Sequence, residues 1–441
     1  MKPASSQAKR RTLFASIAVI IVILTVAAIP TIVRNVTTEK DTQDFAPIYH
    51  AAQAMLEGRN IYSATSGLYI YPPFLAFLFQ PLALLPEHTA AIVWVITSAF
   101  LIVAGALIAA QEVTKRWMPS DQRHWSSTWL IVAAGILLAA EKIHADFRLG
   151  QTDCLMILGF ACVLRWMTRK PWLAGLAVGA TANMKYLSLI FLPYFIIKRN
   201  IRATVASILS FAVLMILPAL EVGIDEATRF AASAIGALIK MTDLRPGLAG
   251  HGMKIPRASW PRSVSITSAV IRFSRAHSFP DWLPVVFILF ALAAVIAAVL
   301  IISRRHGVPL FGLGHFGPGR AADAAVTLEW ACLIVIALTF SPQTTARHMV
   351  LLLLVYIVSA GVLLAQQKQR SRYILALAMM ITSLGLSFPP RKIGIDEALW
   401  AWRGIAGASL CAIFLLLVTL WYGCRTIQTW PAEPENNSNP V

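Results

Sequence analysis

Residues 41–85 read DTQDFAPIYHAAQAMLEGRNIYSATSGLYIYPPFLAFLFQPLALL, and they follow the first long apolar run of the chain. From Phe45 onward, apolar residues recur at helical spacing until Gly58, which predicts a short amphipathic helix along the membrane surface. The carboxylate of Asp44 stands directly before this helix, an unusual place for an acid just past a bilayer edge. The closely spaced prolines in the second half of the stretch favour a surface or re-entrant helix over a complete crossing.

The composition of the whole chain excludes a water-soluble globular protein. Of 441 residues, 57% are hydrophobic and only 13% are charged, which predicts an all-α polytopic membrane protein in contact with membrane lipids. The formal net charge of +17 would indicate nucleic acid in a soluble protein. Here the placement of basic residues relative to the bilayer explains it, so we expect no nucleic-acid partner. The five cysteines lack CxxC spacing and are expected to be buried free thiols without a metal.

The apolar runs predict about twelve transmembrane helices. The positive-inside rule places the N-terminus and the basic loops on the cytoplasmic side. A cleaved signal peptide is the rival interpretation of the first run, but this run is long and lacks a small-x-small cleavage site near its end. The predicted crossings are 12–33, 88–110, 128–143, 153–167, 172–185, 187–197, 201–219, 281–303, 323–341, 348–366, 373–388 and 398–421.

These crossings divide the chain into a cytoplasmic N-terminus (1–11), a transmembrane domain (12–423) and a polar cytoplasmic tail (424–441), which we expect to be disordered. The domain contains a first outer loop at 35–87 and a long outer loop at 220–280. The basic residues of the long loop suit either anionic headgroups or a lipid-linked phosphate. Within this loop, Ile266 to Phe273 form a candidate amphipathic surface helix.

Short motifs follow one another in a fixed order along the chain. They are Asp44 with Tyr49, Ala51, Ala52 and Glu57-Gly58; Tyr62; Tyr71-Pro72-Pro73-Phe74 with Pro81-Leu82; Gly150-Gln151; Pro171-Trp172-Leu173-Ala174-Gly175 ahead of Lys185; and Ser341-Pro342 ahead of His348. In this order and spacing they resemble glycosyltransferase family 87 over nearly the full length. The chain departs from the family pattern at Thr152-Asp153, where asparagine is frequent, and after Pro342, where a tryptophan and paired histidines are common.

The resemblance implies a GT-C glycosyltransferase fold and an inverting hexosyltransferase of the cell inner (plasma) membrane. Such an enzyme moves a hexose, mannose in particular, from a polyprenyl-phosphate donor to a glycolipid or glycan acceptor. Its active site faces the periplasmic or extracytoplasmic side, and no cofactor is expected. The departures from the pattern bear on the donor sugar and the acceptor more than on the fold.

Sugar transfer requires a base for the acceptor hydroxyl and positive charge for the leaving phosphate. By the resemblance, Asp44 is the general base. The alternative is that Asp44 caps the helix that begins at Phe45. Asp41 is a weaker second candidate for the base.

The donor phosphate is expected to contact Lys185, Arg347 and His348. Lys185 could instead extend its ammonium to the lipid headgroups, and the other two could be ordinary polar residues at a helix start. The sugar or acceptor is expected to contact Tyr49, Tyr71, Gln151 and Asp153. For these residues too the alternatives are structural: Gln151 and Asp153 could cap the span near Cys154, and Tyr69, Tyr71 and Trp260 could be interfacial anchors.

Two other interpretations fit the sequence less well. His144 and Asp146 have no third ligand at readable spacing, so no metal site is predicted. A secondary transporter or lipid flippase would share the number of spans, but it would place ionisable groups near the midplane and often repeat its halves. The spans of this chain are nearly free of acids, and no internal repeat is visible.

Overall fold

The computed structural model describes residues 6–37, 43–242, 258–314, 317, 319–388 and 396–430. Within these residues the chain is helical, as predicted, and the only β-type pairing is an isolated antiparallel bridge between Ser263 and Thr345. Asp41 and residues 243–257 of the predicted long outer loop lie outside the described residues.

Seven helical segments among the described residues are long and apolar enough to cross a membrane, so the chain is a polytopic membrane protein. These segments are α1 (Ser6–Thr37), α5 (Glu87–Trp117), α11 (Ile201–Ile216) with α12 (Ala219–Val222), α15 (Leu283–His306), α16 (Arg320–Phe340), η3 (His348–Leu351) with α17 (Leu352–Ala365), and α20 (Gly407–Gln428). The remaining long apolar runs of the sequence are shorter helices or are broken.

The other elements are mostly shorter or amphipathic. They are α2 (Phe45–Leu56), α3 (Ile61–Ala64), α4 (Pro73–Ala83), η1 (Ser120–Gln122), α6 (Trp125–Leu138), α7 (Ala140–Leu149), α8 (Asp153–Trp166), α9 (Pro171–Ala182), η2 (Tyr186–Ile190), α10 (Phe191–Ile197), α13 (Ile224–Thr242), α14 (Ile266–Ala276), α18 (Gln369–Ser387) and α19 (Asp396–Gly404). Of these, α18 is of similar length to the seven segments but is less apolar. The predicted helix after Asp44 is α2, and the predicted surface helix of the long loop is α14.

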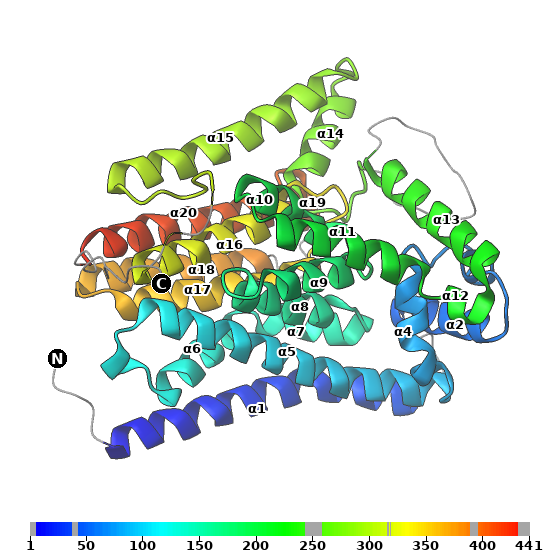
Figure 1. Ribbon diagram of the computed structural model, residues 1–441, viewed down its shortest axis with the longest axis horizontal. Coiled ribbons are helices and arrows are strands. Elements are labelled where there is room, and N and C mark those ends of the chain that lie inside the picture. The colour runs from blue at the N-terminus through cyan, green and yellow to red at the C-terminus, as the bar shows by residue number, and fades with distance from the viewer. Residues whose placement is uncertain are drawn as a thin grey trace, which may run out of the picture.

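The long helices lie side by side in a bundle whose axis is horizontal in Figure 1, with α2, α4, α12 and α13 gathered at the right-hand end. The helices α16 and α17 are buried on nearly all sides and form the centre, whereas α1 and α15 leave most of their apolar surface exposed at the periphery. A helix that is apolar all round and exposed is suited to contact with lipid tails.

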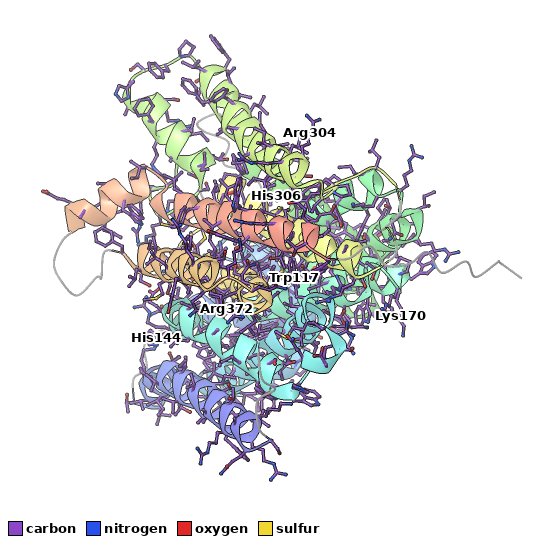
Figure 2. All side chains as sticks on the ribbon, turned by 90° about the vertical axis from the view of Figure 1, so that its left-hand side faces the viewer. Trp117, His144, Lys170, Arg304, His306 and Arg372 are labelled. Carbon is purple, nitrogen blue, oxygen red and sulfur yellow. The ribbon has the colours of Figure 1, made fainter. Side chains whose placement is uncertain are left out.

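The opposite end of the bundle is organised around Trp117, at the end of α5. Its indole Nε1 donates to Thr327 at 2.8 Å, and its ring contacts Trp430, over which the Arg320 guanidinium lies 4.1 Å from the ring centroid. Figure 2 looks at this end and shows Trp117 near its middle, with the basic residues Lys170, Arg304 and Arg372 around it. Basic residues therefore concentrate at the end where α1 begins and α20 ends.

Several predicted boundaries differ from the structure. The predicted crossing at 398–421 divides into α19 and α20, which are separated at Ile405 and Ala406. The predicted crossing at 128–143 breaks at Ala139 into α6 and the amphipathic α7, which buries Ile143 and Phe147 and leaves Glu141 exposed. The predicted crossing at 187–197 is η2 followed by the short α10. The last helix continues to Gln428, so residues 424–428 of the predicted disordered tail are helical, while residues 431–441 lie outside the described residues.

Gly150 sets the approach of α7 to α2. It adopts φ 66°, a left-handed conformation that favours glycine, and ends α7. A Cβ atom at this position would lie 2.6 Å from the Phe45 Cβ, so only glycine lets the two segments come this close. The turn thereby brings Gln151 against the start of α2.

Candidate functional site

Asp44 lies at the start of α2, but it does not cap that helix. Its backbone is helical (φ −74°, ψ −11°), and its side chain accepts no hydrogen bond from the first turn. Instead, Oδ2 accepts a hydrogen bond of 2.7 Å from the Gln151 amide and pairs with the guanidinium of Arg347. The capping interpretation of Asp44 is therefore wrong. Its side chain remains 37% exposed, so a ligand can reach it.

Lys185 does not extend to the membrane surface. Its Nζ lies 2.6 Å from Asp153 Oδ1 and 3.3 Å from Gln151 Oε1, and its side chain is only 11% exposed. Burial by itself would lower the pKa of Lys185, but the neighbouring Asp153 carboxylate raises it, and the net direction is upward. Lys185 is thus held as a buried ammonium ion.

The local backbone explains why Lys185 points inward. The helix α9 ends at Ala182. The side-chain amide of Asn183 then donates to the carbonyls of Gly179 and Phe211, both at 3.0 Å. Lys185 then adopts an extended conformation (φ −146°, ψ 131°) before η2 begins. This step in the chain turns its side chain toward the start of α8.

These contacts connect five polar side chains from four separate segments. Arg347 pairs with Asp44, Asp44 accepts from Gln151, Gln151 accepts from Lys185, and Lys185 pairs with Asp153. We call this set the polar chain. It contains two carboxylates and two cations, so its formal charges cancel. It also accounts for Gln151 and Asp153 without any capping role: Thr152 holds the N-cap position of α8, and no side chain caps that helix.

A cavity of about 560 Å³ lies beside the polar chain. Its polar end is lined by Tyr71, Asp153, Lys185, Arg347 and His348. The rest of its wall is mainly apolar and comes from several helices: Leu187, Leu189, Ile190, Pro193, Leu238, Leu292, Ile336 and Phe340. The cavity is therefore amphipathic, with charge at one end and hydrocarbon along its length.

The Ser341-Pro342 break after α16 positions Arg347 and His348 in the wall of this cavity. Ser341 is extended (φ −69°, ψ 125°), as expected before proline, and it ends α16. The following turn is fixed by a hydrogen bond of 2.9 Å from the Val264 amide to the Thr344 carbonyl. His348 Nδ1 accepts from the Thr345 backbone N–H at 3.2 Å, which fixes the imidazole ring orientation in the cavity wall.

Comparison with known proteins identifies the family of the chain. The model of glycosyltransferase family 87 matches residues 69–314, which is more than half of the chain. The chain belongs to glycosyltransferase family 87.

Curated relatives of this family 87 chain include a polyprenol-phosphate-mannose-dependent alpha-(1-2)-phosphatidylinositol mannoside mannosyltransferase of Mycolicibacterium smegmatis, 28% identical over 81% of the chain and 78% of the relative. A protein of the same description from Mycobacterium tuberculosis is 30% identical, but the match covers 38% of the chain and only 42% of that relative. An alpha-(1->3)-arabinofuranosyltransferase of M. tuberculosis is 28% identical over 38% of the chain and 39% of its own length. No solved structure matches the chain.

Of the residues that the resemblance to family 87 singled out, Tyr49 is not brought to the site. It is 4% exposed, and its hydroxyl donates to the Leu85 carbonyl at 2.7 Å, tying α2 to the end of the first loop. The expected sugar or acceptor contact of Tyr49 is therefore not supported by its position. Tyr69 is fully buried, so it is not an interfacial anchor, whereas Tyr71 and Trp260 line the cavity. Burial raises the pKa of the Tyr71 hydroxyl, which keeps it a hydrogen-bond donor.

The sequence of this family 87 member indicated Asp146 only as a possible metal ligand with His144, and its place beside the site was not predicted. Its side chain is 1% exposed and lies next to Asp153. Its spacing relative to Ile143 and Phe147 places it on the buried face of α7, and this periodicity was the available signal. His144 points elsewhere, its ring nitrogen lying 3.1 Å from the Ala27 carbonyl of α1. The described residues contain no group of three potential metal ligands.

Proposed function

We propose that the chain transfers a hexose, mannose in particular, from a polyprenyl-phosphate donor to a glycolipid or glycan acceptor, with inversion at the anomeric carbon. This proposal rests on the Asp44 carboxylate, which makes no capping hydrogen bond to α2 and pairs with Arg347 beside an amphipathic cavity. The mycobacterial relatives that depend on polyprenol-phosphate-mannose support this donor, and their phosphatidylinositol mannoside acceptors support a glycolipid acceptor.

In the proposed reaction, Asp44 takes the proton of the acceptor hydroxyl as its oxygen attacks the anomeric carbon. The bond from that carbon to the phosphate oxygen breaks, and polyprenyl phosphate leaves. Pairing with Arg347 requires an ionised carboxylate, which is the form that accepts a proton. A single displacement of this kind inverts the configuration of the sugar.

The donor phosphate is assigned to the polar end of the cavity, near Lys185, Arg347 and His348. A guanidinium can bind phosphate in a bidentate manner, and a fixed ammonium stabilises the charge that develops on the leaving group. The apolar wall between η2, α16 and α15 suits the first isoprene units of the donor. Tyr71, Gln151 and Asp153 are assigned to sugar or acceptor hydroxyls.

We assign the end of the bundle with α2, α4 and α13 to the extracytoplasmic side of the inner membrane. The basic residues around Trp117 at the other end support this orientation. With α6, α8, α9, α10 and α18 added to the seven apolar segments described above, the bundle is assigned about twelve crossings, as in a GT-C fold. The helices α2 to α4 would then be surface helices of the first outer loop, within a transmembrane domain at 12–423.

The test is sugar transfer by the purified protein in lipid, with a panel of polyprenyl-phosphate sugars. Asp44→Asn removes the base while an amide keeps the size of the side chain, and we expect transfer to fall by about 10³-fold. Asp121→Asn, at an exposed site in η1 at the basic end, is the matched control and should leave transfer unchanged. Transfer that survives Asp44→Asn in a folded protein would exclude Asp44 as the base. Movement of a solute or lipid across the bilayer without any transfer would favour a transporter or flippase instead.

A further inference from the structure

Two aspartates face each other across the Gly150 turn. Asp146 belongs to α7 and Asp153 begins α8, and their side chains are 1% and 0% exposed. No group in the described part of the chain donates a hydrogen bond to either oxygen of Asp146 or to Oδ2 of Asp153. Asp153 Oδ1 is satisfied by Lys185. Three buried carboxyl oxygens are thus without a donor.

One proton satisfies two of these three oxygens. Two adjacent buried carboxylates cannot both remain ionised, and buried polar atoms without a partner cost free energy. The side chains of Asp146 and Asp153 lie close enough for their charges to interact, so a proton can join them. A proton on Asp146 converts it into a donor to Asp153 Oδ2, while Asp153 stays ionised and pairs with Lys185.

The surrounding charges assign that proton to Asp146. Burial raises its pKa well above the usual carboxyl range, and the Asp153 carboxylate raises it further. Lys185 and Arg347 act in the opposite direction but pair with Asp153 and Asp44. The other ionisable groups nearby include His348 and Tyr71, which lie near Asp153, and Cys154, which lies near Asp146. Arg34 of α1 donates to the Arg148 carbonyl at the end of α7. No ionisable residue occurs in α6.

The geometry points to Asp146 as a positioning residue that stays protonated and, through its hydrogen bond to Asp153, fixes the orientation of the polar chain. This inference rests on the proposed function for its effect on sugar transfer. Lys185 fixes the Gln151 carbonyl, so the amide nitrogen of Gln151 must face Asp44 Oδ2. An ionised Asp146 would compete with Gln151 for the ammonium of Lys185 and release that amide.

The experiment compares wild type with Asp146→Asn and Asp146→Ala. The Asn side chain donates to Asp153 as the protonated acid does, whereas Ala leaves Asp153 Oδ2 without a donor. We expect Asp146→Ala to lower kcat by about tenfold or more and Asp146→Asn to restore most of it. Wild-type kcat should decline at alkaline pH as Asp146 loses its proton, and Asp146→Asn should lack this decline.

An infrared measurement separates this inference from the proposed reaction. The C=O band of a protonated carboxyl should be present in wild type at neutral pH and absent in Asp146→Asn, whether or not any sugar is transferred. No transfer with any donor, with this band present, would count against the proposed function and leave the protonated carboxyl supported. Absence of the band would overturn the inference. A folded but inactive Asp146→Asn, beside an active wild type, would also overturn it, because the ionised form would then be the one required.

Discussion

The Asp44 carboxylate and the Arg347 guanidinium form an ion pair across 303 positions of sequence, joining the start of α2 to the turn before α17. Neither side chain is fully buried, at 37% and 22% exposed. The pair closes one end of the polar chain. Arg347 lines the cavity, whereas Asp44 does not line it and is accessible through the exposed part of its side chain. Substitutions at this pair and at the residues connected to it should therefore affect donor binding and transfer directly.

Arg347→Ala should lower kcat/KM for a polyprenyl-phosphate donor by about 10²-fold or more, because it removes a charge-assisted contact to the leaving phosphate. Arg347→Lys keeps the charge but loses the planar fork of the guanidinium, so it should restore only part of that loss. The measurement is steady-state transfer in lipid. Arg202→Ala, at an exposed site on α11, is the control. Equal activity of Arg347→Ala and this control would remove Arg347 from the site.

Asp153→Asn should destabilise the protein by about 3–5 kcal/mol, because it leaves Lys185 as a buried charge without its carboxylate. Combining it with Lys185→Gln should cost less than the sum of the two single changes, since the pair is then removed together. Denaturant or thermal unfolding in detergent measures both effects. Glu226→Gln breaks the exposed pair with Arg229 and should cost about 1 kcal/mol or less. Additive effects of the first two changes would contradict the pairing.

Gly150→Ala should reduce both stability and transfer. The alanine would have to adopt a left-handed backbone conformation, and its Cβ would clash with Phe45, at a cost of about 1–3 kcal/mol or more. The clash would also move Gln151 away from Asp44. Gly58→Ala is a close control, because Gly58 has nearly the same φ of 65° but a Cβ added there would meet no atom within 4 Å. It should lose about 1 kcal/mol of stability and keep its transfer activity. The same loss of transfer in both variants would show that backbone strain alone is responsible.

Leu292→Trp should raise KM for donors with long polyprenyl chains more than for donors with short ones. Leu292 of α15 lines the apolar part of the cavity, and a larger ring there would occupy the space assigned to isoprene units. Leu289→Trp, on the exposed surface of the same helix, tests for a general effect of tryptophan. Kinetics with two donor lengths measure the difference. Equal KM changes for both lengths would exclude this wall as the lipid site.

Asp146→Asn should become more stable than wild type as the pH rises. The pKa of Asp146 is raised in the folded state above its unfolded value of about 3.9, so the folded chain binds a proton that the unfolded chain has released. Stabilisation by this group is therefore complete below the unfolded pKa and is lost as the pH rises through the folded pKa. The amide of the variant does not titrate. Parallel curves of Tm against pH for the two proteins would contradict a raised pKa.

The sequence predicted much of what is local in this protein. Helical periodicity located α2 and α14, and the Ser-Pro pair located the break before Arg347 and His348. The break at Ala139 was missed, because the apolar run continues through it and only the polar face of α7 marks the change.

The contacts of the candidate site could not be predicted in the same way. An aspartate before a helix is equally suited to capping, and only the folded structure shows that the Asp44 side chain makes no capping hydrogen bond to α2. The partner of Asp44 is more than 300 positions away, and periodicity carries no information about such pairs. Tyr49 is a motif residue that the sequence alone would place in the site, but in the structure its hydroxyl connects α2 to the end of the first loop.

The pairing of Asp44 with Arg347 also has a consequence for the order of events. A guanidinium that turns to a donor phosphate weakens its hold on the carboxylate, so the donor itself would free the base. In the absence of donor, the guanidinium keeps the carboxylate oriented toward itself rather than toward a hydroxyl group of the acceptor. Productive binding would then be sequential, with the lipid-linked sugar entering before the acceptor.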